Sequence, residues 1–434
     1  MNDVAQQMRP TPAARAGGGP VIGLVIGRFI WGAPALRLAL ALGFGLLAVG
    51  MLRAQRPVDT DPLNNTPAVR DAFQRFYNLD YDGALARFQQ IAAQHSSDPI
   101  ATTYVLDCVL FRELYRLDLL DTTFYANDGF LTGRQTVVQD PQVRDRVNEL
   151  ADRAIGQAND ILKSNPNDVN ALFARGWARS LKATYLAMVD RSFGGGLHLA
   201  LQARSDHDKV LELDPNYVDA KMVVGVYQFV VGSLPFAFKL LIGFTGITGS
   251  KSKGMEMLRD SAARGVITSV ESRTAMALFL RREAQYPEAI NITRNLSVQY
   301  PHDFLFFLEE GNLLKDAGKG PEAIAAYRRL IDEAKRPGFF SNPHLELAWY
   351  GLGDTLRGQN MNADAVTAYE QGAAQPTISP ELKRRCLLNA GEVLDRMNQH
   401  DRAIPQYQAV IALGPETVQG EAARKYIRSG YDGR

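Results

Sequence analysis

Three stretches in the last third of the chain carry the same residue types at the same offsets, and this repetition constrains the fold more than any other feature. In each stretch a Gly precedes an Ala by 12 positions, and the Ala precedes a Tyr by 4. The three copies consist of Phe307, Gly311, Leu314, Ala323, Tyr327 and Leu330; of Trp349, Leu352, Gly353, Leu356, Ala365 and Tyr369; and of Leu387, Gly391, Leu394, Ala403, Tyr407 and Pro415.

These offsets have a physical explanation in a pair of helices. The Gly of the first helix lets the second helix approach closely, the small Ala meets it there, and the Tyr fills the space toward the next pair. Pro415 ends a helix, since it lacks an N–H and disfavours helical geometry in the residue before it. The pattern resembles the tetratricopeptide repeat, a helix–turn–helix unit of about 34 residues. This resemblance implies a protein that binds other proteins and does not catalyse a reaction.

Weaker copies of the pattern continue toward the N-terminus. They are carried by Ala84, Phe88 and Ile91; by Ala154, Ala158, Ile161 and Pro166; by Ala203, His207, Val210 and Pro215; by Gly254 and Leu258; and by Ala289, Thr293, Leu296 and Pro301. We therefore expect an all-α fold, a right-handed superhelical α-solenoid of about eight units over residues 66–430. A polar helix near Glu421–Arg428 is expected to cap the last apolar face, as the ends of solenoids require.

Charge is distributed unevenly along the chain, although the formal net charge is only +1. Residues 1–54 hold five Arg and a single acid, Asp3, which leaves 43 basic and 46 acidic residues in the rest. The body thus carries about −3 and gives no reason to expect nucleic acid or anionic lipid as the main partner. Its composition of 46% hydrophobic and 22% charged residues is ordinary for a folded domain.

The N-terminal segment resembles a targeting sequence. Residues 1–35 predict a disordered basic leader, residues 36–54 a signal peptide or a signal-anchor helix, and residues 55–65 a linker. Leu38–Leu52 carries no charge, and the basic residues lie before it, as in a segment inserted with its N-terminus in the cytoplasm. Ala48–Gly50 offers small residues for cleavage, whereas Phe29–Leu52 is long enough for an anchor. A cytosolic helix is the alternative. The segment predicts a protein anchored in the membrane or secreted to the bacterial periplasm.

Three insertions interrupt the expected array, at residues 118–142, 183–199 and 225–254. In the third, residues 222–238 contain no charged side chain. Such a run is short for a membrane span, and Pro235 would break its helix. We expect a buried helix followed by a bent apolar hairpin. Contact with a membrane or with a hydrophobic ligand is the alternative for this insertion.

Part of this region also resembles a second family. The shared residues are Gly225, Phe229, Ser233–Pro235, Lys239–Leu241, Phe244, Gly246, Gly254 and Leu258, preceded by the turn at Phe193–Gly196. They make residues 185–258 similar to the inclusion-body clearance and tetratricopeptide-39-type proteins. The resemblance implies a shared way of building an insertion inside the array, and that family has no catalytic residues to transfer.

The sequence offers no convincing constellation for chemistry. Gly246–Ser252 is similar to a phosphate-binding loop, but Ser250 stands where a Gly should precede the Lys. The six His show no paired metal-ligand spacing, and the two Cys are expected to be buried and free. His207 is expected to pack between units, and Glu309–Glu310 to be a solvated helix face. We expect no enzyme activity, no cofactor and no metal.

The first helix of each unit should line a concave groove that binds a partner. In the clear units the candidate groove residues are Leu308, Asn312, Lys315, Tyr350, Asp354, Arg357, Arg385, Leu388, Glu392 and Arg396. This mixed lining suits an extended peptide or a helix. A carboxylate clamp of the kind some relatives use is not reproduced, because Leu308 replaces a needed Lys. The expected function is a non-catalytic scaffold for a protein or peptide partner. The alternative is a protein that binds lipid or a hydrophobic ligand, or contacts a membrane, through residues 225–254.

Overall fold

The computed structural model describes residues 58–125, 138–234 and 248–433. The chain divides into residues 1–57 and 58–434, so the predicted leader, signal segment and most of the linker lie outside the described part. Much of the first and third insertions, residues 126–137 and 235–247, also lies outside it. Within the described part, no helix has both the length and the apolar character needed to cross a membrane.

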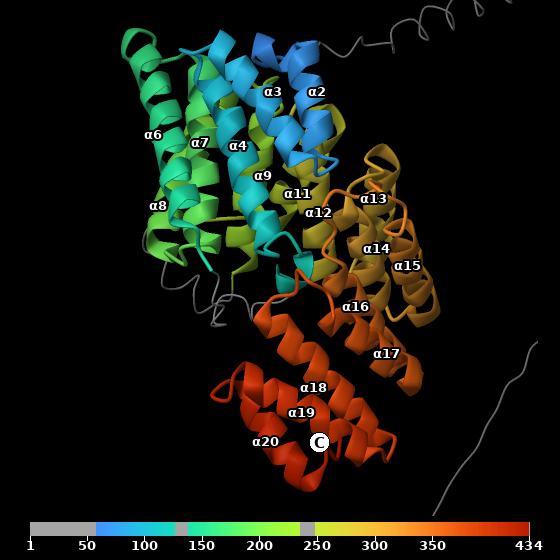
Figure 1. Cartoon of the computed structure of the whole chain (residues 1–434). Helices are drawn as coiled ribbons and strands as arrows, with labels where there is room; N and C mark the ends of the chain where they lie inside the picture. Colours follow the sequence, from blue (N-terminus) through green and yellow to red (C-terminus); the bar gives the residue numbers. More distant parts are fainter. Residues whose placement is uncertain (1–57, 126–137, 235–247, 434) are drawn as a thin grey trace, which may run out of the picture. The chain divides into compact units, whose positions relative to one another are not determined.

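The described residues form seventeen α-helices and no β-strand, which confirms the predicted all-α fold (Figure 1). The helices follow one another as packed pairs, and we number the pairs as units 1 to 8. Units 1 to 4 are α2 (Pro67–Phe76) with α3 (Tyr81–Gln94), α4 (Pro99–Arg116) with α6 (Pro141–Ser164), α7 (Val169–Met188) with α8 (Phe193–Leu213), and α9 (Ala220–Ser233) with α11 (Lys251–Arg264).

The second half of the array is more regular. Its pairs are α12 (Ser269–Arg282) with α13 (Tyr286–Gln299), α14 (Phe304–Asp316) with α15 (Gly320–Glu333), α16 (Leu345–Gly358) with α17 (Asn362–Ala373), and α18 (Pro380–Arg396) with α19 (His400–Leu413). A last helix, α20 (Val418–Ser429), packs on α19 and α18 as the predicted cap. Two short 3₁₀ helices, η1 (Pro62–Asn65) and η2 (Thr122–Tyr125), complete the described elements.

Several helices begin with the same local signal, a capping side chain followed by Pro. Thr66, Asp98, Asp140 and Ser379 each accept a hydrogen bond from a backbone N–H in the first turn of α2, α4, α6 and α18. The following Pro has no N–H to leave unpaired, and its φ suits the first helical position. These four helix starts are therefore encoded locally, before any tertiary contact forms.

Contacts inside the units explain the repeated Gly and Tyr. A Cβ added to Gly311 would lie 2.7 Å from the ring of Tyr327, and one added to Gly391 would lie 2.4 Å from the ring of Tyr407. Tyr327 also reaches the following unit, where a Cβ on Gly351 would lie 2.6 Å from it. The Tyr thus fills the space both within its unit and toward the next one, as its spacing predicts.

The weaker units use the same geometry with other residues. His207 is fully buried, and a Cβ on Gly176 would lie 2.5 Å from its ring. Its Nδ1 lies 2.8 Å from the carbonyl oxygen of Ala203, and burial lowers the pKa of the imidazole to about 4. In unit 4, Gly225 and Gly254 let α9 and α11 approach backbone to backbone. The expected packing role of His207 is confirmed.

The residues at 183–199 are helical for most of their length. α7 runs to Met188 and α8 starts at Phe193, so only four residues connect them. The Gly residues after Phe193 lie in the first turn of α8. The extra residues therefore lengthen both helices of unit 3.

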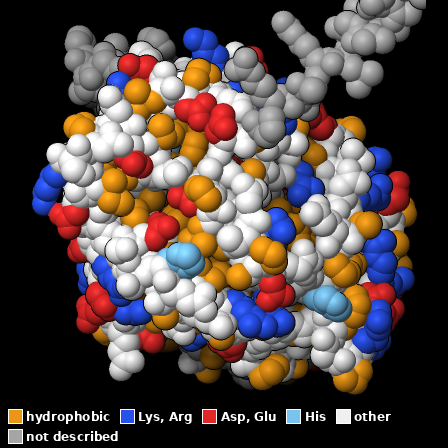
Figure 2. All heavy atoms as spheres, turned by 90° about the horizontal axis from the view of Figure 1, so that it is seen from above, with side chains coloured by type: hydrophobic (Ala, Val, Ile, Leu, Met, Phe, Trp, Pro, Cys, Tyr) orange, Lys and Arg blue, Asp and Glu red, His pale blue; other side chains and the backbone are white. Residues whose placement is uncertain are grey.

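Side chains of both charge signs are interspersed over the face of the molecule in Figure 2, with hydrophobic side chains between them. The near balance of charge in the sequence of the body therefore also holds locally on this face. Such a surface is typical of a folded protein in water.

Candidate functional site

The predicted groove residues fall into two different environments. Those on α16 and α18 face one another and form a ladder of contacts between units 7 and 8. We call this set the α16–α18 ladder; it consists of Tyr350, Asp354, Arg357, Arg385, Asn389 and Glu392. None of the six is fully buried and none is fully exposed.

Hydrogen bonds to the Tyr350 hydroxyl make up one end of the ladder. Arg385 donates to this oxygen at 2.8 Å, and its guanidinium lies 4.6 Å from the centre of the Tyr350 ring. Asn389 donates to the same hydroxyl and to Asp354 Oδ1, both at 3.4 Å. Burial, with the Asp354 carboxylate nearby, raises the pKa of Tyr350, so its hydroxyl stays protonated.

An ion pair forms the other end of the ladder. Arg357 Nη2 lies 2.9 Å from Glu392 Oε2, with side chains that are 21% and 12% exposed. Burial raises the pKa of Glu392, although Arg357 opposes the shift. Beyond the pair, Tyr431 donates its backbone N–H to Asp395 Oδ2 at 2.7 Å, so the last residues of the chain reach this face.

Two further predicted residues flank the ladder. Leu388 is half-buried and packs against the hydrophobic core, whereas Arg396 is exposed at the end of α18. The structure therefore brings five of the ten predicted groove residues, and Asn389 with them, into contact between α16 and α18. They combine hydrogen-bond donors, acceptors and apolar surface along one line.

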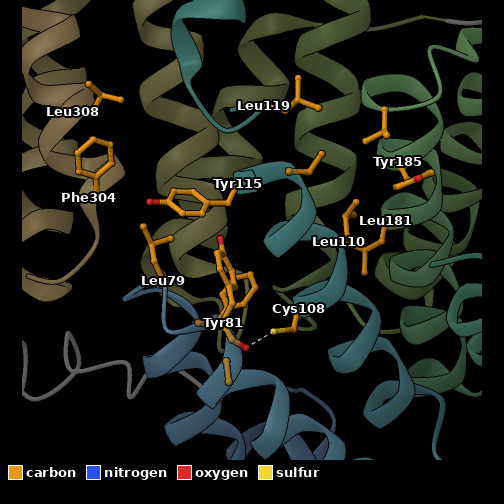
Figure 3. Close-up of a cluster of buried hydrophobic side chains, with 14 of the residues drawn as sticks. Leu79, Tyr81, Cys108, Leu110, Tyr115, Leu119, Leu181, Tyr185, Phe304 and Leu308 are labelled. Atoms are coloured by element: carbon orange, nitrogen blue, oxygen red, sulfur yellow. Dashed lines mark hydrogen bonds between the residues drawn. The ribbon is translucent and has the colours of Figure 1, made fainter. Parts of the chain in front are cut away.

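The remaining three predicted residues lie on α14, and two of them are not available to a partner. Leu308 and Asn312 are 2% and 4% exposed, and Lys315 is half-buried. Figure 3 shows Leu308 and Phe304 in the same buried cluster as Tyr115 and Leu119. Tyr115 lies on α4 of unit 2, and Leu119 follows the end of that helix. The expectation of an open groove along α14 is therefore wrong, because the chain covers that surface itself.

The covering segment begins at the end of α4 and includes η2 (Figure 1). Asp121 accepts a hydrogen bond from the Asn312 amide at 3.3 Å, and the Thr122 hydroxyl donates to Glu309. The Tyr327 hydroxyl donates to Asn312 Oδ1 at 2.7 Å from the other side. A residue expected to face a partner is thus held between two parts of its own chain.

Arg281 lies at the centre of this contact and is only 4% exposed. Its guanidinium lies 2.6 Å from Asp316, 3.3 Å from Glu309 and 2.6 Å from the Thr122 hydroxyl. Burial raises the pKa of Glu309 to about 7, against the opposing effect of Arg281. We call Thr122, Arg281, Glu309 and Asp316 the Arg281 cluster.

The expectation that Glu309 and Glu310 form a solvated helix face is also wrong. Both side chains are buried, and Glu310 pairs with Arg294 at 2.8 Å and with Arg329. A carboxylate can be buried at tolerable cost when guanidinium groups pair with it. The sequence alone does not show which basic side chains will pair with two adjacent acidic residues on a helix.

Further contacts join units 1 and 2 to units 5 to 7. The Tyr77 hydroxyl donates to Glu271 and, at 3.2 Å, approaches the carbonyl oxygen of Ile267. The Tyr115 hydroxyl donates to the carbonyl oxygen of Asn342 at 3.0 Å. The N-terminal units therefore lie on the inner surface of α12 and α14 and reach the start of α16. The one sequence signal for this is the apolar residue Leu308 at a position expected to face solvent.

A pocket of about 270 Å³ lies apart from these residues, between units 1 to 3. Three of its lining side chains are carboxylates, but each already accepts a backbone N–H: Asp61 from Leu63, Asp98 from Ile100 and Asp168 from Ala171. These acids act as helix caps, so the pocket has a structural explanation.

Comparison with known families agrees with the repeat. Residues 308–381 match the family model described as tetratricopeptide repeat. No curated protein matches the chain. The narrower resemblance of residues 185–258 to inclusion-body clearance and tetratricopeptide-39-type proteins stays a prediction.

The chain is also similar to solved structures, at low sequence identity and low TM-score. PilW, described as a widely conserved type IV pilus biogenesis factor, is 15% identical over 57% of this chain and 98% of its own, with a TM-score of 0.39. The Cut9–Hcn1 complex of APC/C is 14% identical over 85% and 57%, with a TM-score of 0.46. Yeast Tom70 is 10% identical over 84% and 88%, with a TM-score of 0.37.

Proposed function

We propose that this tetratricopeptide-repeat chain is a non-catalytic scaffold that binds a peptide or helix of a partner protein along the α16–α18 ladder. The observation that carries the proposal is the contrast between the two inner surfaces. The surface of α14 is filled by the chain itself, whereas the ladder keeps partly exposed hydrogen-bond donors and acceptors between α16 and α18.

The chemistry of the ladder favours a polypeptide ligand. Arg385 and Asn389 offer N–H groups to backbone carbonyl oxygens or to a carboxylate, while Asp354 and Glu392 accept hydrogen bonds from N–H groups. Leu388 adds apolar surface for an alternate side chain of the ligand. Because most of these groups already hold one another in place, the ladder is ordered before the partner arrives, which reduces the entropic cost of binding.

We also propose that the scaffold works on the extracytoplasmic side of a bacterial membrane, targeted there by residues 36–54. The support is the sequence itself, with basic residues ahead of an uncharged stretch and acids after it. Fractionation of cells that express the full chain, with N-terminal sequencing of the mature protein, tests this part. Recovery of the intact N-terminus in the soluble cytosolic fraction would refute it.

Affinity capture with matched variants tests the binding surface. Tyr350→Ala and Arg385→Ala each remove contacts at one end of the ladder, and Arg336→Ala removes an exposed Arg whose pair with Glu333 lies outside it. We expect a partner retained by the wild type and by Arg336→Ala to be lost, by about tenfold or more in affinity, from both ladder variants. Circular dichroism and thermal melting of each variant establish that it remains folded.

The binding proposal fails if folded ladder variants retain the same partners as the wild type. A cross-linker placed at Arg396, which is exposed beside the ladder, gives a second measure. A cross-linker at Val298, which is 82% exposed on α13, is its control. Equal cross-linking of the partner from both positions would also contradict the proposal.

A further inference from the structure

Three side chains that are far apart in the sequence meet where unit 2 contacts unit 7. Asp118 follows the end of α4, His344 is the residue before α16, and Glu346 lies in the first turn of α16. One ligand atom from each, a nitrogen or a carboxylate oxygen, lies within 4.8 Å of the other two. His344 Nδ1 lies 2.5 Å from Asp118 Oδ1 and 3.7 Å from Glu346 Oε1.

One oxygen of this group has no hydrogen-bond partner. Glu346 is fully buried, and its Oε2 accepts a hydrogen bond from the Thr377 hydroxyl at 2.8 Å. Its Oε1, which faces His344, accepts none. A buried carboxylate oxygen without a partner is costly, because it has lost its water and gained nothing in exchange. This oxygen can therefore accept a further ligand on the side that faces His344.

Tyr115 holds the three residues in place. Its ring lies 4.6 Å from the His344 ring, and its hydroxyl binds the carbonyl oxygen of Asn342, two residues before His344. The carbonyl oxygen of Tyr115 accepts the backbone N–H of Asp118 at 3.1 Å. Asp118 itself adopts a left-handed conformation with φ of 58°, which Asp tolerates better than most residues. The ligands are thus oriented by packing from both units.

We propose that Asp118, His344 and Glu346 bind a divalent transition-metal cation that links unit 2 to unit 7. Two carboxylates and a neutral imidazole carry a charge of −2, which one such cation balances. A set of one nitrogen and two oxygens suits Zn²⁺ or Mn²⁺, whereas Ca²⁺ and Mg²⁺ prefer oxygen ligands alone. Three protein ligands leave a coordination position for water.

Binding requires the three ligand atoms, which lie within 4.8 Å of one another, to move toward a common centre. The imidazole that binds the cation through Nδ1 is neutral and carries its one proton on Nε2. A second proton, where the free ring and Asp118 hold one between Nδ1 and Oδ1, leaves to solvent. Ligands about 2.0–2.1 Å from a tetrahedral metal lie roughly 3.3 Å from one another. The two nitrogen–oxygen distances of 2.5 and 3.7 Å lie on either side of that value, so one lengthens and the other shortens.

The position of the site gives it a structural consequence. It connects the segment that covers α14 to the first turn of the helix that carries half of the α16–α18 ladder. A ligand that binds the folded state alone stabilises that state, so the cation is expected to hold the N-terminal units on the inner surface of the array. This inference rests on the contact geometry and does not depend on the proposed partner binding.

Metal titration of the full-length protein tests the inference. After removal of metal with a chelator, Zn²⁺ is added and followed by calorimetry and by elemental analysis after dialysis. We expect one Zn²⁺ per chain from this site and a higher melting temperature when it is bound. Co²⁺ used in place of Zn²⁺ is expected to give the visible absorption of a tetrahedral complex with nitrogen and oxygen ligands. Ca²⁺ is expected to have no effect on melting.

Three conservative variants identify the ligands. Asp118→Asn, His344→Gln and Glu346→Gln keep the size of each side chain or nearly so, and Asn tolerates the backbone conformation at position 118. Each is expected to weaken Zn²⁺ binding at least as much as loss of an outer contact does, about 10–100-fold. His400→Gln is the control, since it removes another His–Asp pair, with Asp395 at 2.7 Å. It is expected to bind Zn²⁺ like the wild type.

Two results would overturn the inference. One is that the wild type takes up no Zn²⁺ and gives no tetrahedral Co²⁺ spectrum. The other is that Glu346→Gln or His344→Gln, with cooperative melting in chelator as evidence of folding, binds Zn²⁺ as tightly as the wild type. The Co²⁺ spectrum of the wild type needs no variant, so the test stands even if a substitution unfolds the chain.

Discussion

α14 and α16 are the first helices of two successive repeat units, yet the inner surface of α14 is buried and that of α16 is partly exposed to solvent. On α14, Leu308 and Asn312 are buried, and Asn312 contacts Asp121 in the segment that follows α4. Figure 3 shows Leu308 beside Phe304 in a cluster of buried side chains. On α16, Tyr350 and Arg357 remain partly exposed, and they contact the neighbouring unit and, through Arg357, Tyr431. Repeat position therefore determines the side of the array on which a residue lies, but not what covers it.

The two surfaces also treat charge differently. Arg281, beside α14, is enclosed by Glu309, Asp316 and Thr122. Arg385, in the ladder, has a Tyr hydroxyl and ring as its contacts and keeps part of its surface in water. A buried charge such as that of Arg281 stabilises the fold only while its partners are present. A partly exposed charge such as that of Arg385 can still form a contact with a bound partner. Four predictions test this difference, beginning with the largest effect.

Removal of the Arg281 charge is expected to destabilise the protein most. Arg281→Met keeps the packing of the stem but leaves Glu309 and Asp316 without their cation, at a cost of about 3–5 kcal/mol. Denaturant unfolding followed by circular dichroism measures the change. Arg336→Met, which removes the exposed pair with Glu333, is the control and is expected to cost less than about 0.5 kcal/mol. Equal costs would show that the Arg281 cluster is not the enclosed contact described above.

The pH dependence of stability is expected to report on Asp303, the cap of α14, which is nearly fully buried beside Tyr81 and Tyr115. Burial raises its pKa to about 8, although the N–H groups of Leu305 and Phe306 oppose the shift. Between its unfolded pKa near 4 and its folded pKa, the folded state holds a proton that the unfolded state has lost. Stability from this group is therefore present at low pH and is lost as the pH rises toward 8, by about 1.4 kcal/mol per pH unit.

Asp303→Asn isolates that contribution, because Asn caps a helix as well as Asp does. We expect the difference in unfolding free energy between wild type and variant to change steadily between pH 5 and pH 7. Asp168→Asn, at the half-buried cap of α7, is the matched control. A difference that stays constant with pH at position 303 would mean that Asp303 is ionised in the folded protein. Water would then reach Asp303 at the contact of units 1 and 2 with α14.

Helix packing inside the units is expected to be the same on both surfaces. Gly311→Ala and Gly391→Ala each force a Cβ against a Tyr ring, at 2.7 and 2.4 Å, and each is expected to cost about 1–3 kcal/mol. Gly156→Ala, where nothing lies within 4 Å of the new Cβ, is expected to stabilise by up to about 1 kcal/mol. Thermal or chemical unfolding distinguishes these outcomes. If only Gly311→Ala lowered the stability, units 6 and 8 would also differ in how their own two helices pack.

The smallest effect is expected at Asn389. Its two hydrogen bonds in the ladder are long, at 3.4 Å, and the residue is half-exposed. Asn389→Ala is expected to lower stability by less than about 1 kcal/mol. Asn312→Ala, which leaves the buried Tyr327 hydroxyl without its acceptor, is the counterpart on α14 and is expected to cost about 1–3 kcal/mol. If unfolding curves gave both variants the same loss of stability, Asn312 on α14 would be no more enclosed than Asn389 in the ladder.

Helix starts, unit boundaries and intra-unit packing were predictable because their causes lie close together in the sequence. The spacing of Gly391, Ala403 and Tyr407 specifies which faces of two adjacent helices meet, and a cap followed by Pro marks a start such as Ser379–Pro380. The same spacing predicted the five residues that make contacts between α16 and α18, which are Tyr350, Asp354, Arg357, Arg385 and Glu392. Their use by a partner stays a prediction.

The covering of α14 could not be predicted in the same way. Arg281 and Thr122 are 159 positions apart, and Asp118 and His344 are 226 apart. A repeat pattern specifies how each unit packs on its neighbours in the sequence, and it does not specify contacts between distant units. The small rotation from one unit to the next must accumulate over the whole array before distant units meet. No local spacing encodes that sum.

By itself, then, the sequence determined that this chain builds an array of helical hairpins, where several of its helices begin, and which residues pack inside the clear units. The tertiary structure alone decided that units 1 and 2 lie against α12 and α14, that Glu309 and Glu310 are buried, and that Asp118, His344 and Glu346 meet. The physical reason is the range of the interactions. Hairpin packing is settled between neighbouring residues and units, whereas these contacts depend on the path of the entire chain between them.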